Sequence, residues 1–175
     1  GTNLPSHCDR KKTPGIDMTT GSLGQGLSIA CGIAQAHLLN GKSNTIYCIM
    51  GDGESQEGQN WEAVIYAAQQ RLENLILFVD DNQAQIDGYV RQIGQMESYA
   101  DKFRSFHWDV VDVDGHDFTA MHDAILRAKS ITGTPSAIVL HTVKGQGCTF
   151  ALRNWCHHMA VSKEDMEEAL QALNA

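Results

Sequence analysis

The sequence lacks any unbroken apolar stretch of about 18 residues, the length that a membrane-spanning helix needs. Its amino-terminal residues also lack the apolar core of a signal peptide. The five cysteines are odd in number and include no C-x-x-C pair, which argues against a disulfide framework and favours a reduced set of thiols. We therefore expect a cytoplasmic protein that does not associate with a membrane.

Positive charge is also scarce, with 13 Lys and Arg against 21 Asp and Glu and a formal net charge of −8. Nucleic-acid-binding faces need clustered positive charge, so this balance argues against that class of protein. With 175 residues and 42% hydrophobic content, the chain is predicted to fold as a single domain over residues 1–175. It opens on Gly1 in loop-like sequence, and we expect a further segment to precede it.

Short apolar runs alternate with helical patterns along the chain. Strands are predicted at 45–50, 75–79, 108–113 and 136–141. Helices are predicted at 22–39, 55–71, 97–106 and 117–130, with a last one after Ser162, while 80–96 and 142–161 are predicted to be mostly loop. This alternation predicts an α/β fold with a parallel sheet flanked by helices on both faces. Ligands bind such sheets beyond the carboxyl ends of the strands.

Two acidic turns follow the first two predicted strands. The first strand runs into Gly51-Asp52-Gly53-Glu54, and the second into Asp80-Asp81-Asn82. Neighbouring parallel strands would bring Asn82 close to Asp52, and carboxylate and amide oxygens are suitable ligands for Mg²⁺. The glycines permit a close backbone approach to a phosphate. The alternative is ordinary turn capping by Asp52 and Asn82.

The segment GDGESQEGQNWEAVIYAAQQRLENLILFVDDNQAQIDG resembles the thiamine-diphosphate motif in its transketolase form. TTGSLGQGLS (19–28), LPSHCDRKKTPGIDM, VDGHD and HTVKGQG are similar to other segments of that family. The resemblance covers essentially the whole chain. It implies the diphosphate-binding (PP-type) domain of the thiamine-diphosphate-binding fold, without the segment that the family carries at its amino-terminal end.

The resemblance implies a cofactor and a metal site. Thiamine diphosphate would be the cofactor, with Mg²⁺ bound by Asp52, Asn82 and the backbone carbonyl of Ala84; Ca²⁺ or Mn²⁺ could substitute. Gly51 and Gly53 would offer backbone to the diphosphate.

Further residues match family positions around the cofactor rings and the substrate. Gly21 and Leu23 would lie beside the thiazolium and pyrimidine rings, although Leu23 also fits an ordinary core position. His7 would contact substrate hydroxyls and support proton transfer, and a solvated loop histidine is the alternative. Glu57 would hydrogen-bond toward the catalytic Glu of a partner domain, and a solvated Glu in the first turn of a helix is the alternative.

Three later residues also follow strands or loops of the predicted sheet. His157 matches the histidine of a family loop near the diphosphate and the substrate, and the adjacent His158 leaves this assignment ambiguous by one place. His116, after the third strand, is predicted to brace a turn. Lys144, after the fourth strand, could reach a phosphate or be solvated.

No segment resembles the pyrimidine-binding half of such an enzyme. The resemblance therefore implies the amino-terminal section of a split transketolase of the pentose phosphate pathway, which transfers a two-carbon ketol unit between sugar phosphates. It would need a pyrimidine-domain subunit, in a dimer or an α2β2 assembly. The alternatives are a subunit of another thiamine-diphosphate enzyme (1-deoxyxylulose-5-phosphate synthase or the α type of 2-oxo acid dehydrogenase) and a non-catalytic scaffold subunit.

Overall fold

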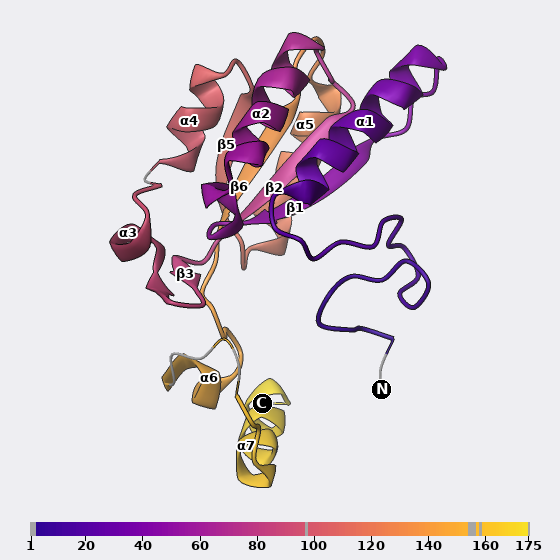
Figure 1. Ribbon diagram of the computed structural model, residues 1–175. Helices are drawn as coiled ribbons and strands as arrows, with labels where there is room; N and C mark the ends of the chain where they lie inside the picture. The colour runs from indigo at the N-terminus through magenta and orange to yellow at the C-terminus, as the bar shows by residue number, and fades with distance from the viewer. Residues whose placement is uncertain (1–2, 97, 154–156, 158, 175) are drawn as a thin grey trace.

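The computed structural model describes residues 3–96, 98–153, 157 and 159–174. Its centre is a four-stranded parallel sheet with the strand order β1-β2-β6-β5 (Figure 1). The strands are β1 (Ile46–Gly51), β2 (Leu75–Asp81), β5 (Asp109–Asp114) and β6 (Ser136–His141). Each begins within one residue of its predicted start. The two inner strands, β2 and β6, are mostly buried, and strands buried on both faces are typically continuous apolar runs.

Helices cover both faces of the sheet, as predicted. One core unites α1 (Gln25–Leu39), α2 (Gly58–Gln69) and α4 (Tyr99–Ser105) with Leu75, Leu77 and Val79 of β2. The intervening residue Ile76 faces the other way, against Ala124 and Ala128 of α5 (Phe118–Ser130). Successive side chains of a strand point to opposite faces, so the sheet separates the two cores. Among the described residues, no helix is both long and apolar enough to cross a membrane.

Two segments predicted to be mostly loop contain short regular elements. Residues 80–96 form the hairpin of β3 (Ala84–Gln85) and β4 (Gly88–Tyr89), followed by α3 (Val90–Ile93). Residues 142–161 contain α6 (Thr149–Arg153). The final α7 (Lys163–Leu173) begins directly after Ser162, as predicted, and Ser162 and Asp165 form a reciprocal capping box at its start. The elements β3, β4, α3 and α6 have too few residues to show a clear hydrophobic period, so the sequence pattern did not predict them.

The helix predicted at 55–71 is divided into a 3₁₀ turn, η1 (Glu54–Gln56), and α2. Two side chains of the first turns of α2 reach back to this segment: Asn60 Nδ2 donates to the Glu54 carbonyl at 2.7 Å, and Trp61 Nε1 donates to the Ser55 carbonyl at 2.8 Å. These carbonyls are therefore satisfied without a continuous α-helix. The result is a tight turn directly after β1.

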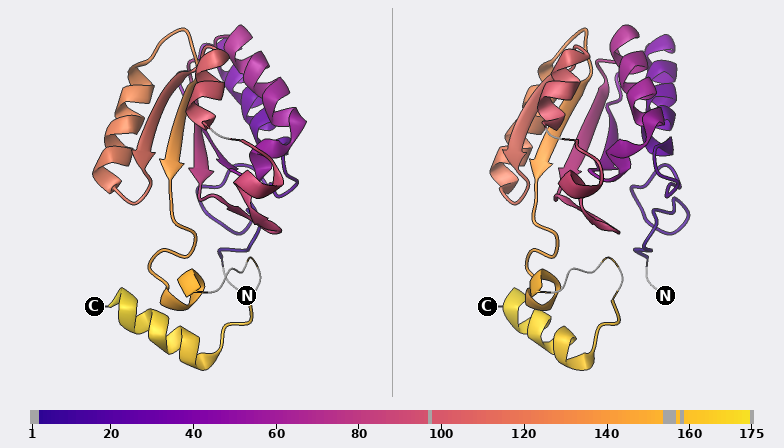
Figure 2. Two further views of the ribbon diagram at one scale, coloured as in Figure 1. Left: turned by 90° about the vertical axis from the view of Figure 1, so that its left-hand side faces the viewer. Right: turned by 60° about the vertical axis from the view of Figure 1, so that its left-hand side comes forward.

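Several segments gather beyond the carboxyl ends of the strands. The amino-terminal loop, the β3–β4 hairpin and the α6–α7 pair all lie on this side of the sheet (Figure 2). Binding sites of parallel α/β sheets are found at this edge.

Candidate cofactor and metal site

Asp52 follows the last residue of β1 and is only 2% exposed. Its Oδ1 accepts a hydrogen bond from the Gly53 N–H at 2.6 Å, and its Oδ2 accepts one from the Ala84 N–H at 3.2 Å. Burial raises the pKa of this carboxyl, against the opposing effect of these backbone donors. Within residues 3–96 and 98–153, no Lys, Arg or His side chain forms an ion pair with it.

Asn82 lies beside Asp52, as the adjacent strand ends require. Gly51 is paired with Asp80 in the β1–β2 register, which brings the two turns together. The Oδ1 atom of Asn82 accepts a hydrogen bond from the Ala84 N–H at 3.0 Å. The same N–H also donates to Asp52 Oδ2. Two side-chain oxygens from different turns therefore converge on one backbone donor.

This donor set suits a hard divalent cation. A buried carboxylate without a cationic partner is costly in a protein interior, and a bound cation would compensate that cost. Among the described residues, no three His, Cys, Asp or Glu side chains are grouped so as to hold a metal ion. A site here would depend on one carboxylate, one amide oxygen and backbone oxygens, which are ligand types that Mg²⁺ accepts together with phosphate and water. Ala84 itself contributes its N–H to the observed contacts.

Gly53 shows how tightly this turn is packed. A Cβ atom added there would lie 2.8 Å from the Cβ of Gln85, which is closer than two carbon atoms approach, and 3.0 Å from its Oε1. Gln85 Oε1 is buried and has no hydrogen-bond partner among the described residues. The backbone of Gly53 thus lies directly against the Gln85 side chain, and this position does not accommodate a side chain of its own.

Glu54 connects this turn to the start of α1, and the sequence patterns did not single it out. Its Oε1 accepts a hydrogen bond from the Gly24 N–H at 3.0 Å, and its Oε2 accepts one from the Gly51 N–H at 3.2 Å. It also lines a groove of about 670 Å³ together with Gly21 and Leu23. The two glycine-rich segments that sequence analysis assigned to the cofactor are therefore joined by one carboxylate.

The remaining candidate residues near α1 are exposed. Leu23 is 55% exposed and lies in the groove rather than in a core. His7 lies against Gly21, because a Cβ at Gly21 would be 2.6 Å from His7 Cδ2. Glu57 is exposed at the start of α2, and its carboxylate does not cap the helix.

Near the carboxyl-terminal helices, His157 is exposed and its Nδ1 lies 3.5 Å from Lys144 Nζ. His158 lies outside the described residues. His116 behaves as predicted, because its Nε2 accepts a hydrogen bond from the Val143 N–H at 2.9 Å and thereby braces the loops after β5 and β6.

A group of polar side chains around Asp81, unpredicted from sequence, lies next to the Asn82 turn. Asp81 is 6% exposed, accepts from Gln83 Nε2 and pairs with His141 Nδ1 at 3.0 Å. It lines a smaller cavity of about 180 Å³ with Tyr99, whose hydroxyl donates to the Asp52 carbonyl at 3.3 Å. Burial is the main cause that raises the pKa of Tyr99 to about 12.

The fold and the site together define an α/β protein with a candidate cation and phosphate site at the carboxyl edge of its sheet. Comparison with known proteins identifies the family. The chain matches the family described as transketolase, thiamine diphosphate binding domain, over residues 1–174. The chain therefore belongs to the transketolase family, as a thiamine-diphosphate-binding domain.

Relatives carry the comparison further. The chain is 49% identical over 172 residues to a protein of Clostridium sp. (strain MSTE9) named 6-deoxy-6-sulfo-D-fructose transketolase subunit SqwG, covering 98% of this chain and 62% of that protein. It is 36% identical to an apulose-4-phosphate transketolase subunit of Actinobacillus succinogenes, with the same two shares. It thus spans about three fifths of the length of these relatives.

A solved transketolase structure from Campylobacter jejuni superposes with a TM-score of 0.84 at 31% identity, covering 97% of this chain and 28% of that one. The expected thiamine-diphosphate-binding fold is therefore confirmed. The similarity to separate transketolase subunits and to a longer transketolase supports a subunit of the transketolase type.

Proposed function

We propose that this chain is the diphosphate- and metal-binding half of a transketolase that transfers a two-carbon ketol unit between sugars and is inactive without a pyrimidine-domain partner. The observation that carries the proposal is the buried Asp52 carboxylate, which has no cationic partner in the described residues and shares a donor with Asn82. When bound, thiamine diphosphate supplies the carbanion chemistry of such a transfer.

The turns after β1 and β2 would hold the cofactor at its charged end. Asp52, Asn82 and the carbonyl of Ala84 would bind Mg²⁺, with Ca²⁺ or Mn²⁺ as substitutes. Gly51 and Gly53 would present backbone to the diphosphate, where a side chain at Gly53 could not be accommodated without displacing Gln85. The protein's contribution at this end is position and charge.

The exposed residues would act toward the substrate and the partner. Gly21 and Leu23, in the groove at the start of α1, would contact the cofactor rings. Glu57 would hydrogen-bond to the catalytic Glu of the partner. His7 and His157 would hold and exchange protons on substrate oxygens, a task for which imidazole side chains are commonly used.

The partner and the substrate follow from the relatives as proposals. Both curated relatives are named as subunits, which supports a second, pyrimidine-domain polypeptide in a dimer or an α2β2 assembly in the cytoplasm. One is named for a phosphorylated sugar and the other for a sulfonated sugar. A sugar phosphate of the pentose phosphate pathway is one candidate donor, and 6-deoxy-6-sulfofructose is the second, favoured by the 49% identity.

Calorimetric titration of thiamine diphosphate with Mg²⁺ tests the proposal, using the chain alone, the chain with the pyrimidine-domain subunit, and the same assembly with Asp52→Ala. We expect tight binding in the assembly and its loss in the variant. Initial rates with 6-deoxy-6-sulfofructose, xylulose 5-phosphate and pyruvate then identify the reaction. Turnover of pyruvate alone would contradict a transketolase, and cofactor binding without turnover of any donor would favour the scaffold alternative.

A further inference from the structure

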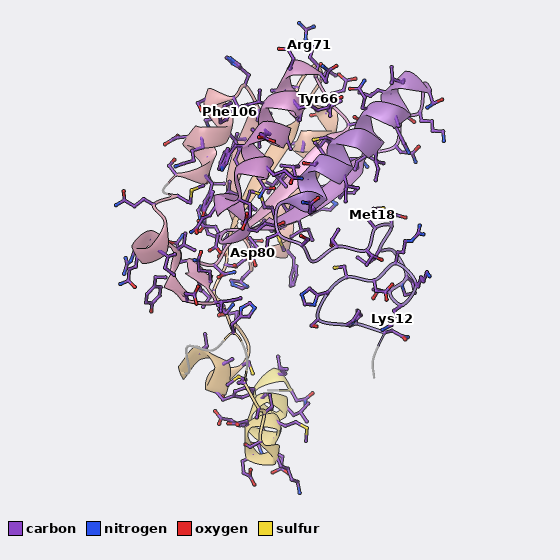
Figure 3. The ribbon with its side chains drawn as sticks, viewed as in Figure 1. Lys12, Met18, Tyr66, Arg71, Asp80 and Phe106 are labelled. Atoms are coloured by element: carbon purple, nitrogen blue, oxygen red, sulfur yellow. The ribbon has the colours of Figure 1, made fainter. Side chains whose placement is uncertain are left out.

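A hydrogen-bonded chain of side chains leads from the loop after β6 to the candidate cation site. Thr142 Oγ1 donates to Asp80 Oδ1, and Asp80 Oδ2 accepts from Asn82 Nδ2 at 3.1 Å. Asp80 lies at the carboxyl edge of the sheet, at the end of β2 (Figure 3). Thr142 and Asp80 are 62 residues apart in the sequence, and the adjacent strands β2 and β6 bring them together.

The orientation of the Asn82 carboxamide is the critical feature. Its nitrogen faces Asp80 Oδ2 and its oxygen faces the Ala84 N–H. The reverse orientation would place the amide oxygen against a carboxylate oxygen and the amide N–H₂ group against a backbone N–H, so both contacts would be repulsive. Only the oxygen of an amide can ligate a hard cation such as Mg²⁺. Asp80 therefore selects the orientation that is competent to bind a cation.

Asp80 is itself held in place. A carboxylate that accepted only from Asn82 could rotate away, but the Thr142 hydroxyl engages its second oxygen. Thr142 is fixed in turn, because its N–H donates to the Asp81 carbonyl at 3.2 Å and the next residue donates to His116 Nε2. The loops after β5 and β6 thus determine where the Asp80 carboxylate points.

We propose that Asp80, held by Thr142, is a positioning residue that keeps the Asn82 carboxamide oxygen turned toward the cation. The inference rests on the proposed function, since it assumes that Asp52 and Asn82 bind the metal. Asp80 does not touch the metal or the cofactor. It acts through Asn82, and the role of Thr142 is to keep the carboxylate of Asp80 in place.

Mn²⁺ affinity, measured by electron paramagnetic resonance in the presence of thiamine diphosphate, tests this role in the chain assembled with its pyrimidine-domain subunit. Asp80→Asn leaves one oxygen for two donors, and we expect the Mn²⁺ dissociation constant to rise about 10- to 100-fold. Thr142→Val, which removes the hydroxyl but keeps the shape, should also weaken binding, whereas Thr142→Ser should restore it. Asp87→Asn removes an equal charge from the exposed turn between β3 and β4 and should leave affinity within about twofold, because exposed charges are strongly screened.

The controls separate two kinds of failure. If the unmodified assembly does not bind Mn²⁺, or if Asp52→Ala binds as well as it does, the proposed function fails. If the unmodified assembly binds and Asp52→Ala does not, but Asp80→Asn matches Asp87→Asn, the positioning role alone is wrong. Circular dichroism of each variant checks that it is folded. If Asp80→Asn does not fold, equal affinities of Thr142→Val and Thr142→Ser would overturn the inference, and a loss confined to Thr142→Val would support it.

Discussion

The residues assigned to the cation and those assigned to the substrate are supported in very different ways. Asp52 is 2% exposed and accepts hydrogen bonds from the N–H of Gly53, in the turn after β1, and from the N–H of Ala84, at the start of β3. His7 and His157, by contrast, are exposed on segments without regular structure. In Figure 3 the amino-terminal loop, with Lys12 and Met18, lies apart from Asp80 at the sheet edge.

The difference has a physical origin. The strands of a parallel sheet fix the backbone of the turns that follow them. The register between neighbouring strands then determines which side chains of those turns lie side by side. The loop over residues 3–23 has no helix or strand of its own, and its histidine has Gly21 as a close neighbour. A site built on strand ends is preorganised within one chain. Residues on such loops depend more on contacts with a ligand or a neighbouring subunit for their position. Under the proposed function, changes in the two groups should therefore have separable effects.

The largest expected effect is on turnover, from the exposed group. His7→Ala and His157→Ala should each lower kcat for ketol transfer about 100- to 10,000-fold, the usual contribution of a general acid–base residue. His7→Ala should not change the dissociation constant of thiamine diphosphate more than about twofold, since His7 is not placed at the metal turns. His157→Ala should also weaken cofactor binding, because His157 is assigned to a loop near the diphosphate. Steady-state kinetics and calorimetry on the same assembly provide the two numbers.

His122→Ala is the matched control, because His122 is 69% exposed on α5, on the opposite face of the sheet from α1. It should change neither number. If His7→Ala lost cofactor affinity by as large a factor as it lost kcat, the residues assigned to the substrate would not act separately from those assigned to the cation.

A smaller effect is expected from the buried turn. Gly53→Ala would force the new Cβ to within 2.8 Å of the Gln85 Cβ, so the hairpin that carries Ala84 must shift. We expect a loss of about 1–3 kcal/mol in unfolding free energy, as in other overpacked sites, and weaker cofactor binding in the assembly. Urea unfolding of the chain measures the first, and calorimetry the second.

Gly58→Ala is the control for this change. A Cβ at Gly58, the first residue of α2, would meet no atom within 4 Å. Alanine is favoured over glycine in a helix, so this variant should be as stable as the unmodified chain or slightly more stable. A Gly53→Ala chain as stable as Gly58→Ala would show that the turn after β1 is not closely packed.

The same contrast explains what the sequence could predict. The apolar runs place all four sheet strands, and their register brings Asp52 beside Asn82, because a strand of period two fixes both position and face. Glu54 was missed, since its partner Gly24 is 30 residues away and nothing in a local pattern marks an acceptor for a distant N–H. Thr142 was missed for the same reason. Contacts between loops depend on the assembled sheet, and no periodicity encodes them.

The smallest effect compares a thiol of the core with one of the loop. Cys31, in α1, is 2% exposed, and burial raises its pKa from 9.0 to about 11, while Cys8 is exposed in the amino-terminal loop. Between pH 9 and 11 the folded chain keeps the Cys31 proton and the unfolded chain releases it. Stability is therefore lost as pH rises, and this thiol should account for about 1 kcal/mol of that loss by pH 10.

Urea unfolding at pH 8 and pH 10 measures the loss in the unmodified chain, in Cys31→Ala and in Cys8→Ala. Other groups titrate over the same range, but they do so in all three chains, so the differences isolate each thiol. Cys31→Ala should lose about 1 kcal/mol less than the unmodified chain on this change of pH, whatever its cavity costs at pH 8. Cys8→Ala, which changes an exposed thiol of the amino-terminal loop, is the matched control and should lose the same amount as the unmodified chain. If Cys31→Ala and Cys8→Ala lose the same unfolding free energy between pH 8 and pH 10, Cys31 is not shielded from water. That result would show that α1 is not closely packed against the sheet around Cys31.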